Sequence, residues 1–190
     1  MDQDHRIIAM DGSPAAKEQK TGVEWYVYHT LRAMNALQPE LHVYVYTHQP
    51  LSFELQGNWE NVVLKRPWYG WKRRWSRALK QLQPDVIWVP GDGLPPSLPK
   101  SAKVVATAHD IGWHYVPDTF SANDRRRLER IYRRYVCECD HIMTVSEATR
   151  QDVLERFGAD PSQVTTVLLG LDNADSRWRE RDASDHDVLL

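Results

Sequence analysis

Residues 103–172 read KVVATAHDIGWHYVPDTFSANDRRRLERIYRRYVCECDHIMTVSEATRQDVLERFGADPSQVTTVLLGLD. Two apolar runs in this stretch, KVVATA and HIMTV, lead directly into polar residues, the first into His109-Asp110 and the second into Ser146-Glu147. One helical segment lies between the two runs, and another follows the second. Ligands of parallel α/β sheets bind at the carboxyl ends of the strands. We therefore expect functional residues of this chain to follow these two strands.

The same alternation of apolar strands and helical segments runs through the rest of the chain. We predict strands over residues 6–10, 41–47, 62–64, 85–89, 103–108, 141–145 and 164–168. We predict helices over residues 22–37 and 69–82, another after Ser121, and a last one capped by Ser146 and ended by Gly158. Strands rich in Val and Ile are typical of sheets covered on both faces.

This pattern predicts one α/β domain, doubly wound and Rossmann-like, with a mainly parallel sheet, over residues 1–172. Residues 173–190 are charged and have no hydrophobic period, so we expect a tail or the start of an interdomain linker.

Composition narrows the class of protein. The chain has 190 residues, is 42% hydrophobic and 26% charged, and carries a net charge of -2, which gives no reason to expect a nucleic-acid partner. Cys137 and Cys139 lie too close in sequence for a disulfide, and nothing has zinc-site spacing, so we expect no metal. The chain shows no secretory start and no apolar run of membrane-spanning length. We expect a cytoplasmic protein, with any membrane contact peripheral and on the inner face.

The loop before Gly22 is the first candidate site. A strand, a polar loop and a glycine at a helix start together present free backbone N–H groups to an anion. Thr21 and Gly22 would then bind phosphate through the backbone. The alternative is that Gly22 only eases the loop into the helix, since the chain contains neither G-x-G-x-x-G nor G-x-x-x-x-G-K-[ST].

The residues after the later strands are the second group of candidates. His109 can exchange hydrogen bonds with a sugar hydroxyl near neutral pH, and Asp110 can orient it or bind a hydroxyl itself. The alternative is that both residues satisfy only local backbone groups. The further candidates for lining a cleft or acceptor pocket are Asp92, Trp113, His114, Ser146 and Glu147. For these, turn formation, surface packing or helix capping is the competing explanation.

The segment KRPWYGWKRRWSRALK, residues 65–80, is basic and rich in tryptophan. An anionic membrane surface attracts such a helix, and so does nucleic acid. The alternative is a solvated charged face whose aromatic residues pack in the core. The residues assigned to a membrane or anionic surface are Arg66, Trp68, Trp71, Lys72, Arg73, Arg74 and Trp75.

Four segments resemble the N-terminal domain of the family 4 glycosyltransferases, which have the GT-B fold: TGVEWYVYHTLRAM, VVATAHDIGWHYVPDTF, DHIMTVSEATRQDVLERFG and VTTVLLGLD. The resemblance implies sugar transfer from a nucleotide-sugar co-substrate to an acceptor with retained configuration, usually without metal or other cofactor. It implies that this domain binds the acceptor, a glycan or a lipid-linked precursor. Gly22 would lie near the donor pyrophosphate, His109 beside the reacting sugar, and Ser146 at the cleft wall.

The resemblance also implies a second domain that binds most of the donor. The printed sequence ends before such a domain, so we expect this chain alone to be inactive and to be part of a longer or two-chain enzyme. The alternative from another class is a non-catalytic module that binds a sugar, a lipid headgroup or a partner protein.

Overall fold

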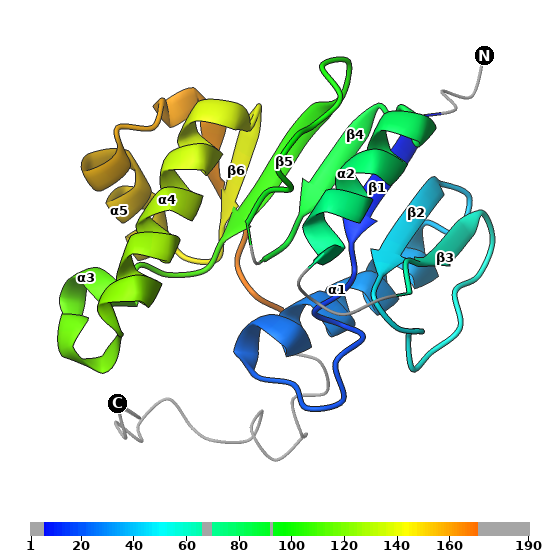
Figure 1. Cartoon of the computed structure of the whole chain (residues 1–190), viewed down its shortest axis with the longest axis horizontal. Coiled ribbons are helices and arrows are strands. Elements are labelled where there is room, and N and C mark those ends of the chain that lie inside the picture. Colours follow the sequence, from blue (N-terminus) through cyan, green and yellow to red (C-terminus); the bar gives the residue numbers. More distant parts are fainter. Residues whose placement is uncertain (1–5, 66–69, 92, 171–190) are drawn as a thin grey trace, which may run out of the picture.

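The computed structural model describes residues 6–65, 70–91 and 93–170 and shows a single seven-stranded sheet flanked by helices (Figure 1). Every ladder is parallel, and the strand order is β3-β2-β1-β4-β5-β6-β7. The strands are β1 (Ile7–Asp11), β2 (His42–Thr47), β3 (Trp59–Val63), β4 (Val86–Val89), β5 (Lys103–Ala108), β6 (His141–Thr144) and β7 (Val164–Thr166). The helices are α1 (Gly22–Leu37), α2 (Trp71–Leu82), α3 (Gly112–Tyr115), α4 (Ala122–Glu138) and α5 (Glu147–Phe157), with short 3-10 turns η2 (Pro117–Thr119) and η3 (Pro161–Gln163).

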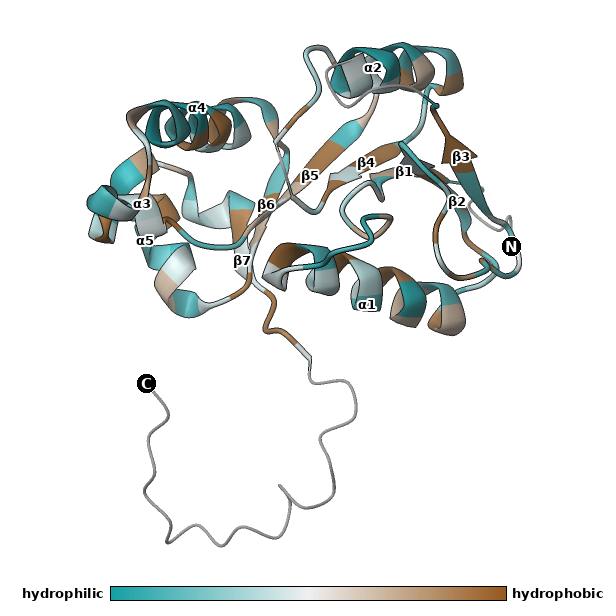
Figure 2. Ribbon diagram, turned by 60° about the horizontal axis from the view of Figure 1, so that its bottom comes forward, coloured by the Kyte–Doolittle hydropathy of each residue, from teal (hydrophilic) through white to brown (hydrophobic). Residues whose placement is uncertain are grey.

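The sheet is doubly wound, as predicted. From β1 the chain moves through α1 to β2 and β3, and α2 then carries it back to β4 on the other side of β1. Figure 2 shows α1 on one face of the sheet and α2 and α4 on the opposite face. The direction of winding therefore reverses between β1 and β4, and this is the place where open α/β sheets leave a crevice beyond their carboxyl ends.

Alternating side chains of the strands build one apolar cluster on each face. On the α1 face, Met10 and Trp88 pack with Val27 and Leu31 of the helix. On the opposite face, a larger cluster joins strand residues to α2, α4 and α5, and its members include Ile87, Ala106, Ile142, Trp75, Leu79, Tyr132, Tyr135 and Val153. Both faces are therefore buried, which explains why the strands read as nearly continuous Val/Ile runs.

The predicted helix ends are confirmed by their capping contacts. Ser121 Oγ accepts a hydrogen bond of 3.0 Å from the backbone N–H of Asp124, and Ser146 Oγ accepts one of 3.1 Å from that of Thr149. Gly158 ends α5 in the left-handed region, with φ of 68°. The predicted strand at residues 62–64 begins earlier, at Trp59, and the turn of helix α3 was not predicted. The predicted boundary at residue 172 and the tail lie outside the described residues.

Two aromatic side chains of the basic tryptophan-rich segment, Trp71 and Trp75, are buried against the sheet. Trp71 and Trp75 stack with a centroid distance of 6.2 Å and are only 8% and 0% exposed, so the assignment of these two to a membrane surface is wrong. Their burial follows from the i, i+4 spacing, which places both on the face of α2 that covers the sheet. Arg73 is exposed, and Arg74 donates a hydrogen bond of 2.8 Å to the carbonyl of Lys65. Arg66 and Trp68 lie outside the described residues.

No helix among the described residues is both long and apolar enough to cross a membrane.

Candidate functional site

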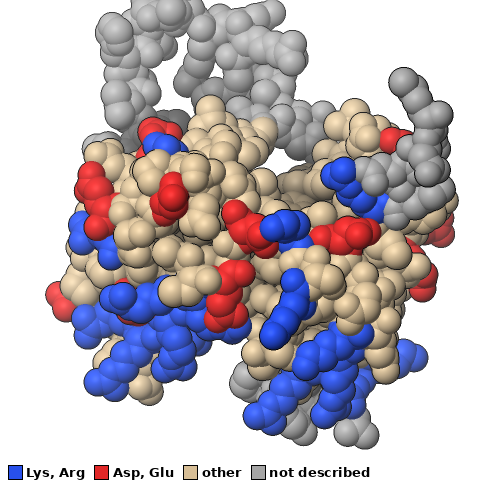
Figure 3. Space-filling view, turned by 90° about the horizontal axis from the view of Figure 1, so that it is seen from above, with Lys and Arg blue, Asp and Glu red and all other residues tan. Residues whose placement is uncertain are grey.

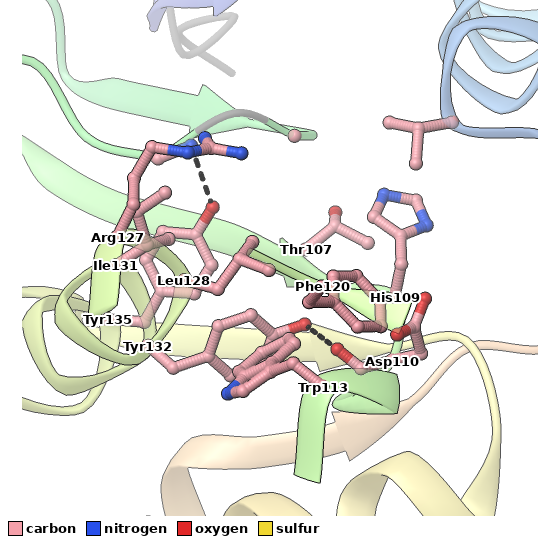
Figure 4. A pocket seen from close by; sticks show the side chains of 13 residues that line it. Thr107, His109, Asp110, Trp113, Phe120, Arg127, Leu128, Ile131, Tyr132 and Tyr135 are labelled. Atoms are coloured by element: carbon pink, nitrogen blue, oxygen red, sulfur yellow. Dashed lines mark hydrogen bonds between the residues drawn. The ribbon is translucent and has the colours of Figure 1, made fainter. Parts of the chain in front are cut away.

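The carboxyl ends of β4 and β5 and the first turn of α1 surround a hollow of about 210 Å³ (Figure 4). Polar or charged lining residues are Thr107, His109, Asp110 and Arg127, and two glycines, Gly91 and Gly93, complete the floor. The aromatic and aliphatic lining residues are Val23, Trp113, Phe120, Leu128, Ile131, Tyr132 and Tyr135. An apolar cavity with a few converging polar groups is typical of a small-molecule site.

His109 is held in one orientation at the end of β5. Its Nε2 lies 2.7 Å from the carbonyl oxygen of Pro90, and its ring meets Tyr26 edge-on at 4.9 Å. Because a carbonyl only accepts, the Nε2 nitrogen carries the proton in this contact. In the neutral ring the Nδ1 nitrogen is then a hydrogen-bond acceptor. The backbone is fixed as well, since Thr149 Oγ1 donates a hydrogen bond of 3.0 Å to the carbonyl of His109.

Asp110 accepts two hydrogen bonds that hold the chain around it in place. Its Oδ1 accepts a hydrogen bond of 2.8 Å from the backbone N–H of Gly112, and its carbonyl accepts one of 2.6 Å from the hydroxyl of Tyr132 (Figure 4). Burial raises the pKa of Tyr132, and the nearby charge of Asp110 adds to this, so the phenol stays protonated and donates. The side chain of Asp110 lines the hollow while it also shapes the turn into α3.

The first turn of α1 opens on the same hollow. Val23 lines it, and a Cβ on Gly91 would lie 3.0 Å from Val23 Cγ1, so the Gly91 loop runs directly against this turn. A Cβ placed on Gly22 would meet no atom within 4 Å. Among the described residues, none accepts a hydrogen bond from the backbone N–H of Gly22 or Val23. Two free donors and the positive end of the helix dipole are therefore available to an anion.

Thr21 and Glu24 form a capping box at this helix start. The Glu24 carboxylate accepts a hydrogen bond of 3.0 Å from the backbone N–H of Thr21 and contacts its hydroxyl, and Lys17 Nζ lies 2.6 Å from the other oxygen. Burial by itself raises the pKa of Glu24, but the hydrogen bonds from Lys17 and Thr21 outweigh burial and lower the pKa to about 2. Thr21 is therefore occupied with capping, which leaves Gly22 and Val23 as the donors that face outward.

A buried ion pair lies beside the site and was not predicted. Asp11, at the end of β1, is 1% exposed and lies 2.8 Å from Lys72 Nζ of α2. The same ammonium donates a hydrogen bond of 2.7 Å to the carbonyl of Gly93. Lys72, assigned from sequence to an anionic surface, instead ties α2 to β1 and to the loop on the floor of the hollow. Gly93 itself has φ of 79°, and a Cβ there would lie 2.9 Å from Ile131.

Of the remaining residues predicted from the sequence, Trp113 lines the hollow and His114 does not. Trp113 forms part of the wall of the hollow, with its ring edge-on to Tyr132 at 4.9 Å. His114 lies beyond that wall, where its Nε2 is 3.0 Å from Glu129 Oε2. Asp92 lies outside the described residues.

Ser146 and Glu147 are not among the residues that line the hollow. Ser146 caps α5, and Glu147 is exposed and accepts a hydrogen bond of 2.7 Å from Thr166 Oγ1. That hydrogen bond, with the Arg150 side chain, lowers the pKa of Glu147. The structure thus gives both residues a role at the start of α5, and this helix start supports His109 through Thr149.

Sequence reasoning missed several residues of the hollow. Leu128, Ile131 and Tyr132 of α4 line the hollow, and nothing in the sequence of this helix showed that they face a cavity. Thr107 and Phe120 carried no signal of their own. Within residues 6–65, 70–91 and 93–170, no three His, Cys, Asp or Glu side chains are grouped as a metal site requires.

Comparison with known proteins connects this geometry to a family. The profile described as Glycosyltransferase Family 4 matches residues 20–175, which is most of the chain and includes the α1 start and His109. The chain belongs to glycosyltransferase family 4. The match and the doubly wound parallel sheet identify it as an N-terminal domain of this family, which is one half of a GT-B fold.

Solved structures agree on the fold of this family 4 domain. The Anabaena protein Alr3699/HepE, solved in complex with UDP and glucose, superposes with a TM-score of 0.53 at 14% identity, covering 88% of this chain and 45% of that one. The wall teichoic acid polymerase TagF superposes with a TM-score of 0.51 at 10% identity, covering 86% of this chain and 38% of that one. The family 4 domain thus spans less than half the length of either neighbour. A search of curated proteins found no match.

Proposed function

We propose that this chain is the acceptor-side half of a retaining glycosyltransferase that moves a sugar from a nucleotide-sugar donor to a glycan or a lipid-linked acceptor. The observation that carries the proposal is that the first turn of α1 and His109 border the same hollow at the switch point of the sheet. A transferase of this kind must hold a leaving diphosphate and an acceptor hydroxyl side by side, and the two features suit these two tasks.

The start of α1 suits the leaving group. Negative charge develops on the diphosphate as the bond from the sugar to it breaks, and fixed N–H donors at a helix start stabilise such charge. Gly22 and Val23 supply two donors with no other acceptor among the described residues, and the missing side chain of Gly22 lets a phosphate come close. Most other donor contacts belong, in this proposal, to a second domain.

His109 suits the acceptor side. Because the Nε2–H group of His109 donates to the carbonyl oxygen of Pro90, the ring offers Nδ1 as an acceptor for a sugar hydroxyl. This contact orients the reacting oxygen. Aromatic faces from Trp113 and Phe120 line the space where a sugar ring would lie. The nucleotide sugar is a co-substrate, and the proposed reaction uses neither a metal nor another cofactor.

The cellular setting remains part of the proposal. We place the protein in the cytoplasm, with peripheral contact to the inner face of an anionic membrane when the acceptor is lipid-linked. Support comes from Arg73, which is exposed on α2, and Arg74 beside it. Because HepE was solved with UDP and glucose, UDP-linked sugars are the first donors to test.

A pair of glycine substitutions tests the donor side. Gly22 is the first residue of α1 and Gly70 is the N-cap of α2, and a Cβ at either position meets no atom within 4 Å. In the gene product that contains this chain, Gly22→Val is expected to raise KM for the nucleotide sugar about tenfold, because the new side chain blocks the phosphate. Gly70→Val is the matched control and should leave KM unchanged. Equal kinetics for the two variants would remove the proposed role of α1.

A further inference from the structure

Three consecutive arginines begin the exposed side of α4 at the border of the site. Arg127 lines the hollow that contains His109, whereas Arg125 and Arg126 line a second hollow of about 340 Å³. Trp113 belongs to the walls of both hollows. Figure 4 shows Arg127 and Trp113 at the first hollow. The second hollow is completed by His114, Ala122 and Glu129.

The charge of α4 is poorly balanced by its own carboxylates. The helix carries six arginines and no lysine against three acidic residues. Arg133 lies 2.6 Å from Glu129, Arg134 lies 2.6 Å from Glu138, and Arg127 is only within 3.9 Å of Asp124. Among the described residues, no carboxylate lies within 4.0 Å of Arg125, Arg126 or Arg130. Glu129, which also lines the second hollow, already contacts both Arg133 and His114.

This arrangement does not help the helix to fold. Positive side chains in the first turns oppose the helix dipole, whose positive end is there. Arg126 and Arg130 are also a like-charge i, i+4 pair, which destabilises a helix by about 0.2–0.5 kcal/mol. Arg125, Arg126, Arg127 and Arg130 are exposed, whereas Arg134 is half-buried and donates hydrogen bonds to the carbonyls of Leu94 and Pro95. Figure 3 shows Lys and Arg gathered in two groups on this side of the molecule, one over α4 and the other over α2.

The shared wall is aromatic. Trp113 is 5% exposed, and its indole nitrogen, like those of Trp71 and Trp75, is buried without a hydrogen-bond partner in the described structure. A ligand in either hollow would therefore meet the ring of Trp113 and not its N–H. The guanidinium groups at the rim favour a ligand with anionic oxygens.

We propose that Arg125 and Arg126, together with the Trp113 wall, form a subsite for an anionic group, a phosphate or a carboxylate, carried by the acceptor. This inference rests on the proposed function, because it takes the hollow around His109 as the place of the acceptor sugar. Guanidinium binds both anions through paired N–H···O contacts, which fits a helix that uses only arginine. The subsite is separate from the start of α1, which is assigned to the donor phosphates.

Binding of inorganic pyrophosphate tests the subsite without any transfer reaction, and every 190-residue chain used in this titration also carries Gly22→Val, so that the phosphate site proposed at the start of α1 is blocked. Calorimetric titration of the Arg125→Gln/Arg126→Gln variant is expected to show affinity weakened about tenfold or more, the loss for two charge-assisted contacts. The control, Arg77→Gln/Lys80→Gln, removes two exposed charges of α2 and should change affinity less than twofold. Equal weakening by both variants, or by neither, would overturn the proposal, because binding would then follow net charge alone or lie elsewhere.

Vesicles identify the source of the anion once pyrophosphate binding depends on Arg125 and Arg126. If the wild-type chain sediments with phosphatidylglycerol vesicles but not with phosphatidylcholine vesicles, and the double variant does neither, the anionic group belongs to a lipid-linked acceptor. If the wild type binds neither vesicle, the group belongs to a soluble acidic glycan. Since no donor is present, failure here leaves the role of Gly22 and His109 unaffected, and failure of the transfer experiments leaves this result standing.

Discussion

At the scale of single residues, the buried pair of Asp11 and Lys72 shows the limit of sequence reasoning. The two residues are 61 positions apart, and Lys72 stands among arginines and tryptophans that suggest a surface role. Only the return of α2 over β1 brings the ammonium to the carboxylate. By contrast, that Val23, in the first turn of α1, and His109 line one hollow follows from a general rule, since the carboxyl ends of parallel strands lie on the same side of the sheet.

Removing Lys72 tests this pair. Lys72→Met is expected to lower the free energy of unfolding by about 3 kcal/mol, because the carboxylate of Asp11 would stay buried without its counter-charge. Urea unfolding followed by circular dichroism measures the change. Arg73→Gln, one position along and exposed, should cost less than about 0.5 kcal/mol. Adding Asp11→Asn to Lys72→Met should recover part of the loss; a Lys72→Met variant as stable as Arg73→Gln would show that the pair contributes nothing.

At the scale of elements, the apolar strands and the capped helices were predictable, whereas the polar first half of β3 and the four-residue helix α3 were not. The apolar stripe of α1 and the serine caps of α4 and α5 gave the helix starts within a residue. Strand β3 is an edge strand paired only with β2, and its polar residues Glu60 and Asn61 hid its first half. Helix α3 is four residues long, too short to show any period. Yet this turn places Trp113, which lines both hollows.

The start of α1 makes a prediction about pH. Glu24 has its pKa lowered from 4.5 to about 2, so its contribution to stability is fully present above pH 4.5 and is lost as pH falls toward 2. Glu24→Gln keeps the shape of the capping box but removes the charge, and should cost about 1–2 kcal/mol at pH 7. Unfolding in urea at pH 7, 5 and 3 should show the gap between wild type and variant narrowing at pH 3. Glu54→Gln, an exposed loop position, is the control and should show no gap; a constant gap for Glu24→Gln would mean that charge plays no part.

At the scale of the whole molecule, one half of a GT-B fold brings the proposed donor and acceptor features to a single edge. Ser146 does not line the hollow, but it caps α5, and Thr149 of that helix donates a hydrogen bond to the carbonyl of His109. The sequence motifs could indicate which edge matters, but they could not show that α4 contributes both its apolar stripe and its arginines there. Side-chain direction around a cavity depends on packing between elements, and no local pattern encodes it.

The most direct measurement compares two histidines at opposite ends of neighbouring strands. His109 follows the carboxyl end of β5 at the site. His141 lies at the amino end of β6, where its Nε2 lies 3.0 Å from Thr165 Oγ1. In the gene product that contains this chain, release of nucleotide from UDP-linked sugars with acceptor present is measured for His109→Ala and His141→Ala, with folding checked by circular dichroism. We predict that His109→Ala lowers kcat/KM about 100-fold or more and that His141→Ala leaves it nearly unchanged. Folded His109→Ala protein with wild-type kcat/KM would contradict the assignment of the reaction to this hollow.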